Sequence, residues 1–157
     1  MPLRNEGLFL FLYKIINMNA YQIFQHAHSG WAYLTVLMAI VFFLTVSFYA
    51  LNRKLKDNMI TKISFFTTVI FHIQLLMGVV LYFLSPYAKW TENTMKDETN
   101  RLYAVEHPLI MFTAVILITV ANSKIKKSET IKIPVAILSL FALACILSRI
   151  PWEAWLS

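Results

Sequence analysis

The chain has 157 residues, of which 59% are hydrophobic and only 14% are charged. This composition excludes an ordinary soluble domain and indicates an integral membrane protein. Three glycines and five prolines exclude a low-complexity chain, and the single Cys145 excludes a disulfide framework or a paired-cysteine metal site. A net charge of +6 would suggest nucleic-acid binding in a soluble protein, but the placement of the charges gives a different explanation.

Residues 1–19 form an N-terminal extension. Residues 7–16 are mostly apolar but too few to cross a bilayer, and no small-residue cleavage site follows them. We therefore expect a short interfacial segment rather than a signal peptide, with Met18 as an alternative start. Residues 20–157 are expected to form one transmembrane domain.

Four apolar stretches follow, at residues 31–51, 63–84, 102–121 and 131–150. A hydrocarbon core ~30 Å thick needs ~20 helical residues, which is about the length of each stretch. The stretches are apolar on all sides, whereas the strands of a membrane barrel alternate. The sequence thus predicts an all-α membrane protein, an up-down bundle of four transmembrane helices with a short N-terminal interfacial segment.

The charges predict the orientation. Eight bases and two acids lie between the first and second spans and between the third and fourth; the bases are Arg53, Lys54, Lys56, Lys62, Lys124, Lys126, Lys127 and Lys132. The rest of the chain carries six bases and six acids, so the whole excess is on one side. The positive-inside rule places that side in the cytoplasm and both termini in the periplasm of a bacterial inner membrane. Topology accounts for the positive charge without nucleic acid.

Ionisable side chains inside spans are expensive and usually face a partner or a ligand. Three histidines occupy three spans, namely His28, His72 and His107, and Arg149 lies at the outer end of the fourth. His26 is two residues from His28, about 200° around a helix, so we expect it to be interfacial.

Depth favours one pair of histidines. His28 is expected at the outer mouth of the first span and His107 five residues into the third, and these spans are diagonal in an up-down bundle. His72 lies twelve residues before Leu84, near the middle of the membrane. Two facing imidazoles can supply both axial ligands of haem b, and Arg149 can pair with a haem propionate. We therefore expect His28 and His107 to ligate the iron, with His72 as the alternative partner.

Simpler interpretations stand beside this one. Glu106 and Pro108 can start a helix around His107, and His72 with Gln74 can form a polar contact between helices. Gly30 and Gly78 can make room for a macrocycle, but glycines in membrane helices more often serve helix packing. A zinc or copper site would need three or four ligands at one depth, which the spacing does not provide. No catalytic residues are assigned.

Several segments resemble a known family. These are His26-Ala27-His28-Ser29-Gly30-Trp31, the run from His72 to Tyr82, Met95-Lys96-Asp97, Ala104-Val105-Glu106-His107-Pro108 and Arg149-Ile150-Pro151-Trp152. In this order, over about residues 20–153, they resemble a small four-span membrane family of Bacteroidetes-type bacteria that is labelled cytochrome b-like. The resemblance implies a haem-binding four-helix bundle and matches His28, His72, His107 and Arg149 as the polar positions.

The sequence therefore predicts a haem b protein that transfers electrons as a subunit or partner of a membrane redox complex, with membrane lipids around it and quinol as a candidate donor. Two alternatives remain open. The chain could be a non-catalytic accessory or assembly subunit whose histidines only join helices, or a proton or metal-ion conduit through His72.

Overall fold

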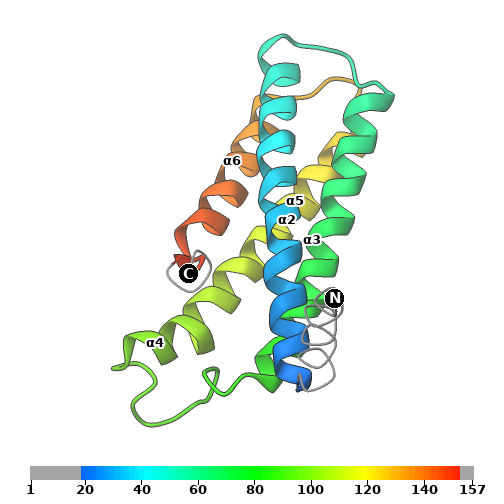
Figure 1. Ribbon diagram of the computed structural model, residues 1–157. Helices are drawn as coiled ribbons and strands as arrows, with labels where there is room; N and C mark the ends of the chain where they lie inside the picture. The colour runs from blue at the N-terminus through cyan, green and yellow to red at the C-terminus, as the bar shows by residue number, and fades with distance from the viewer. Residues whose placement is uncertain (1–18, 153–157) are drawn as a thin grey trace, which may run out of the picture.

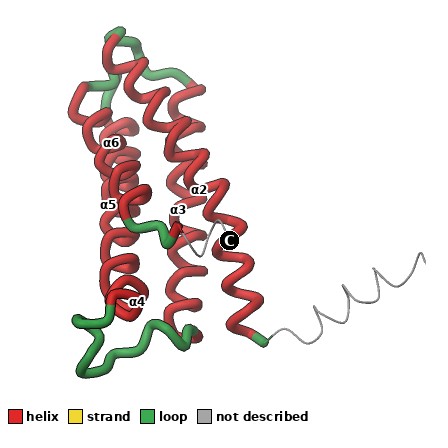
Figure 2. Tube along the Cα trace, turned by 60° about the vertical axis from the view of Figure 1, so that its left-hand side comes forward, coloured by secondary structure: helices red, strands yellow, loops and turns green. Residues whose placement is uncertain are grey.

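The computed structural model describes residues 19–152. The predicted interfacial segment of the N-terminal extension lies outside the described residues. The described part is all-α, as predicted, and its four long helices are α2 (Ala20–Leu51), α3 (Asn58–Leu84), α5 (His107–Lys127) and α6 (Ile133–Ser148). The short helix α4 (Glu98–Arg101) and the π-helical turn η1 (Leu102–Glu106) run directly into α5. Successive long helices run in opposite directions (Figures 1 and 2).

Polar caps start the first two long helices earlier than the apolar stretches predict. The backbone N–H of Asn19 donates to Gln22 Oε1 at 3.1 Å, and the N–H of Gln22 donates to Asn19 Oδ1 at 3.0 Å. This reciprocal capping box begins α2 at Ala20 rather than at residue 31. Asp57 caps α3 in a similar way through the N–H of Ile60, at 3.0 Å. As a result His28 lies inside α2, eight residues beyond its start, and not at the helix mouth.

Each long helix has two principal neighbours. Helix α2 packs against α3 and α6, and α5 packs against the same two helices. Helices α2 and α5 therefore face each other diagonally across the bundle, as predicted for the first and third spans.

One end of the bundle carries the loops of residues 52–57 and 128–132 together with the lysine-rich last turn of α5, and is called the basic end below. The loops lie side by side (Figure 1) and are joined by a bridge between Leu55 and Thr130. The backbone N–H of Lys56 donates to the carbonyl of Glu129 at 2.6 Å, and the ammonium of Lys56 donates to the carbonyl of Lys126 at 2.9 Å. These bonds connect the α2–α3 hairpin to the α5–α6 hairpin.

The interior is a narrow apolar core. Phe42, Phe71 and Ile118 are fully buried, and alanines from α2, α5 and α6 allow close approach of the helices. A buried hydrogen bond of 2.8 Å joins Ser64 Oγ of α3 to Asn122 Oδ1 of α5. Many large apolar side chains on the outer faces of all four helices are exposed, which suits a lipid environment.

Three helices in the described part are long and apolar enough to cross a membrane: α2, α3 and the continuous helix from Glu98 to Lys127. Helix α6 has only 16 residues, which is ~24 Å and less than the ~30 Å core. Pro134 stands in its first turn and Pro151 follows its end, where proline disfavours helical geometry in the preceding residue. The fourth helix is thus shorter than the predicted span of residues 131–150.

Candidate functional site

The structure brings His28 and His107 together at the end of the bundle opposite the basic end, called the histidine end below. Their ring centroids are 6.2 Å apart, and the ring planes are inclined at 74°. One ring comes from α2 and the other from α5, the diagonal helices. The predicted pairing of these two side chains is therefore present in the geometry.

The His28 ring contacts α3 through two residues one helical turn apart. Gln74 Nε2 donates to the backbone carbonyl of His28 at 3.1 Å and lies 3.3 Å from Nε2 of the ring. A Cβ atom added to Gly78 would stand 3.2 Å from Cε1 of His28. Glycine at 78 therefore lets α3 approach the ring more closely than an alanine would allow.

Two buried polar atoms in this contact have no hydrogen-bond partner among the described residues. They are Nδ1 of His28 and Oε1 of Gln74. Buried polar atoms are nearly always satisfied in proteins, so an unpartnered pair this close together calls for an explanation such as a water or a ligand.

The backbone around His107 is irregular for an identifiable reason. Pro108 has no N–H to donate to the carbonyl of Ala104 four residues earlier, and that carbonyl instead accepts from the hydroxyl of Tyr82 at 3.2 Å. The preceding turn is π-helical, with the N–H of His107 donating to the carbonyl of Leu102. π-Helical turns within α-helices occur frequently at functional sites.

The tautomer of His107 follows from its hydrogen bond. Nδ1 lies 2.7 Å from the backbone carbonyl of Arg149 at the end of α6. A carbonyl oxygen can only accept, so Nδ1 carries the proton and Nε2 of the neutral ring carries a free lone pair. This arrangement is typical of metal-ligating histidines, whose second nitrogen usually donates to a carbonyl or carboxylate.

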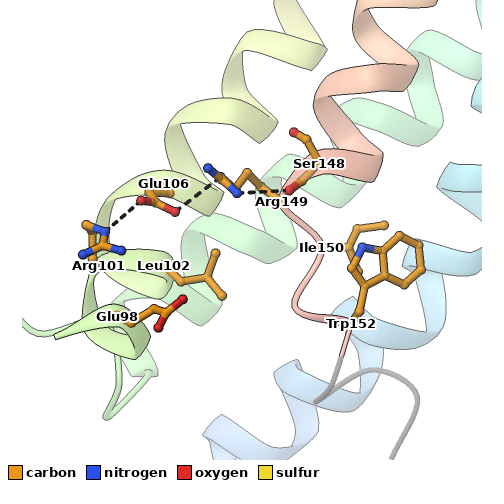
Figure 3. A pocket seen from close by; sticks show the side chains of 8 residues that line it. All are labelled: Glu98, Arg101, Leu102, Glu106, Ser148, Arg149, Ile150 and Trp152. Atoms are coloured by element: carbon orange, nitrogen blue, oxygen red, sulfur yellow. Dashed lines mark hydrogen bonds and ion pairs between the residues drawn. The ribbon is translucent and has the colours of Figure 1, made fainter.

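Glu106, next in the chain to His107, joins two arginines. Its carboxylate accepts from Nε of Arg101 at 2.9 Å and pairs with Nε of Arg149 at 3.3 Å. Glu106 therefore lies within a continuous helix and acts as an ion-pair partner, not as the side-chain cap of a helix start. Figure 3 shows the three side chains beside a cleft of about 340 Å³ that also includes Glu98 and Trp152.

His72 and His26 lie apart from this site. His72 is exposed on α3, and its Nδ1 bonds to the carbonyl of Thr68 in the same helix at 2.7 Å. Residues 72 and 74 are about 200° apart around a helix, so with Gln74 against His28 the ring of His72 must point away. Gln74 thus pairs with His28 across helices, and not together with His72 as the sequence suggested. His26 is exposed, consistent with the interfacial position expected for it.

Two features of this site were not predicted from the sequence. They are the contact of Gln74 with His28 and the ion pairs of Glu106 with two arginines. The signal for the first was present, because Gln74 and Gly78 are four residues apart and share one helix face. Within residues 19–152 no three His, Cys, Asp or Glu side chains converge as a metal-binding group. Comparison with protein family models, with curated proteins and with solved structures gives no match to this chain.

Proposed function

We propose that this protein is a haem b-binding integral membrane protein that transfers electrons as a subunit or partner of a membrane redox complex. The single observation that carries the proposal is the approach of His28 and His107 from diagonal helices, with ring centroids 6.2 Å apart. Metal–nitrogen bonds of about 2 Å on both sides of one ion put two imidazole centroids about 6 Å apart. The separation therefore fits two axial ligands.

The nitrogens of the two rings also fit a metal. Nε2 of His107 has its lone pair free because Nδ1 donates to the carbonyl of Arg149. Nδ1 of His28 is buried without a partner, so each ring has one nitrogen held by a neighbouring helix and one that is not. The glycine at 78 lets the backbone of α3 pack against the His28 ring and holds the ring in place.

The chain's own residues would hold, orient and insulate the group. His28 and His107 would provide the axial nitrogens, and the carbonyl of Arg149 fixes the ring of His107. The pairing of the Arg149 guanidinium with a propionate remains a prediction. Haem, when bound, would supply one-electron chemistry at a potential set by its axial ligands and surroundings.

The proposal includes an orientation of the protein in the membrane. The basic end would face the cytoplasm of a bacterial inner membrane and the histidine end the periplasm, since basic loops are retained on the cytoplasmic side. We propose that α6, although it has only 16 residues, completes a four-helix transmembrane bundle. A chain with this architecture would exchange electrons with quinol or with a protein partner.

A haem count tests the proposal. The full chain is purified in mild detergent after expression with ample haem supply, and haem per chain is measured by pyridine haemochrome with a reduced-minus-oxidised spectrum. About one haem b per chain supports the proposal. Protein without haem, correctly folded by circular dichroism, contradicts it.

A second candidate is an accessory subunit in which the same side chains only join helices. Interhelical contacts favour it: Gln74 with His28 between α3 and α2, and His107 with the carbonyl of Arg149 between α5 and the end of α6. Each such bond stabilises a membrane bundle by about 1 kcal/mol. This candidate predicts colourless protein and histidine variants that lose only stability.

A further inference from the structure

The cleft beside Glu106 holds unused hydrogen-bond donors. It lies between the α4–η1 segment and the end of α6, and has a volume of about 340 Å³ (Figure 3). Arg101 donates to Glu106 and to the carbonyl of Met95. Arg149 forms an ion pair with Glu106 and donates, at 3.4 Å, to the carbonyl of Ser148. Most of the N–H donors on the two guanidinium groups therefore have no acceptor among residues 19–152.

The charges in the cleft have a definite arrangement. One carboxylate, that of Glu106, serves both Arg101 and Arg149, so this triad keeps one positive charge. Glu98 also lines the cleft and forms no ion pair with another described residue. In Figure 3 the side chain of Glu98 lies below Arg101 and Leu102, apart from the ion pairs that Glu106 makes with the two arginines. The cleft thus offers donors for an oxyanion and, separately, a carboxylate for a cation.

The remaining lining is apolar. Leu102, Ile150 and Trp152 contribute it, and tryptophan is enriched where membrane helices meet the headgroup region. The side chain of Arg149 is 48% exposed and that of Glu106 is 29% exposed, so the charged part is open to the surroundings. A ligand for this cleft should carry both charges on a polar head and attach to an apolar body.

We propose that the cleft binds the headgroup of a phospholipid of the phosphoethanolamine type. Its phosphate would lie against the guanidinium groups of Arg101 and Arg149, its ammonium would face Glu98, and its acyl chains would follow the apolar lining. A haem propionate presents the same kind of oxyanion but has no cation for Glu98. The inference does not rest on the proposed haem.

The test uses the full chain in nanodiscs of equal parts phosphatidylethanolamine and phosphatidylglycerol, then extraction into mild detergent and native mass spectrometry of the retained lipid. We expect about one phosphatidylethanolamine per chain, and roughly tenfold weaker retention in Arg149→Gln, the loss of one charge-assisted hydrogen bond. Lys89→Gln, at the same end but outside the lining, is the matched control and should retain lipid. Glu98→Gln should lose the preference for phosphatidylethanolamine.

Several results would overturn the inference. These are no retained lipid in the unaltered chain, equal retention in Arg149→Gln, or a fall in haem content of Arg149→Gln with its lipid unchanged, which would assign the oxyanion to a propionate. If Arg149→Gln does not fold, Arg149→Lys keeps the charge without the planar fork. Weaker lipid retention in that variant would support the inference, and unchanged retention would contradict it.

Discussion

The two helical glycines offer a matched pair of substitutions. A Cβ atom at Gly30 would meet nothing within 4 Å, whereas a Cβ atom at Gly78 would stand 3.2 Å from Cε1 of His28. Both residues lie inside long helices, so Gly→Ala brings each the same backbone gain, about 0.5–1 kcal/mol. The difference between the two variants therefore isolates the contact with His28.

The size of the stability difference between the two variants depends on how freely the His28 ring can move. His28 has Gln74 on one side and the ring of His107 6.2 Å away centroid to centroid, so it cannot retreat freely. Overpacking in cores costs about 1–3 kcal/mol, and an overlap of a few tenths of an ångström belongs at the lower limit. We expect Gly30→Ala to stabilise the protein and Gly78→Ala to be about 1 kcal/mol less stable than Gly30→Ala. We expect Gly78→Val to be less stable than Gly30→Ala by about 2–3 kcal/mol.

Unfolding in mild detergent, followed by far-ultraviolet circular dichroism, measures these differences. If His28 ligates haem as proposed, the haem content of the folded Gly78→Val variant should also be lower, because the valine side chain would displace the His28 ring. Equal stability of Gly30→Ala, Gly78→Ala and Gly78→Val would refute the close approach of α3 to His28, and with it the geometry of the site.

Other consequences concern the rest of the bundle. Ser64→Ala leaves Oδ1 of Asn122 without its buried donor and should lower the free energy of unfolding by about 1 kcal/mol. Ser123→Ala, at an exposed position, is the control and should change the free energy of unfolding little. Equal effects of the two substitutions would contradict the hydrogen bond between Ser64 and Asn122. The hydroxyl of Tyr49 donates to the carboxylate of Asp57 at 2.6 Å. This hydrogen bond is the largest cause of the lowered pKa of the Asp57 carboxyl. Folding favours the charged form, so this stability is fully present above the ordinary carboxyl range and is lost as the pH falls through the lowered folded pKa. Tyr49→Phe should raise the pKa in an NMR titration and flatten the acid limb of the stability profile; an unchanged titration would contradict this.

Much of this arrangement is readable from the sequence, and the exceptions have physical causes. Hydropathy and charge predict the antiparallel helices and the basic end, because the outer faces of the helices are apolar and the basic residues gather at one end of the bundle. Hydropathy misplaced the start of α2, since Asn19 and Gln22 cap the helix with polar residues that an apolar stretch excludes. Depth predicted the approach of His28 and His107 because diagonal helices follow from an up-down order.

Side-chain direction is harder to read from depth alone. His72 was expected as the alternative partner, yet the placement of Gln74 against His28 turns it outward. The bridging of Glu106 to Arg101 and Arg149 depends on the end of α6 meeting the start of α5. The spacing of residues along the sequence cannot predict this tertiary contact.

The proposed function requires that His28 and His107 together hold one haem. The most direct measurement is the haem content and reduced-minus-oxidised spectrum of four variants prepared side by side, His28→Ala, His107→Ala, His72→Ala and His26→Ala, each checked for helical content. We expect the first two variants to lose the haem spectrum proposed for the unaltered chain and the last two to keep it, because the side chains of His72 and His26 are exposed away from the site. Loss of the spectrum in His72→Ala with its retention in His107→Ala, or no haem in any folded form, would contradict the proposal that His28 and His107 ligate haem.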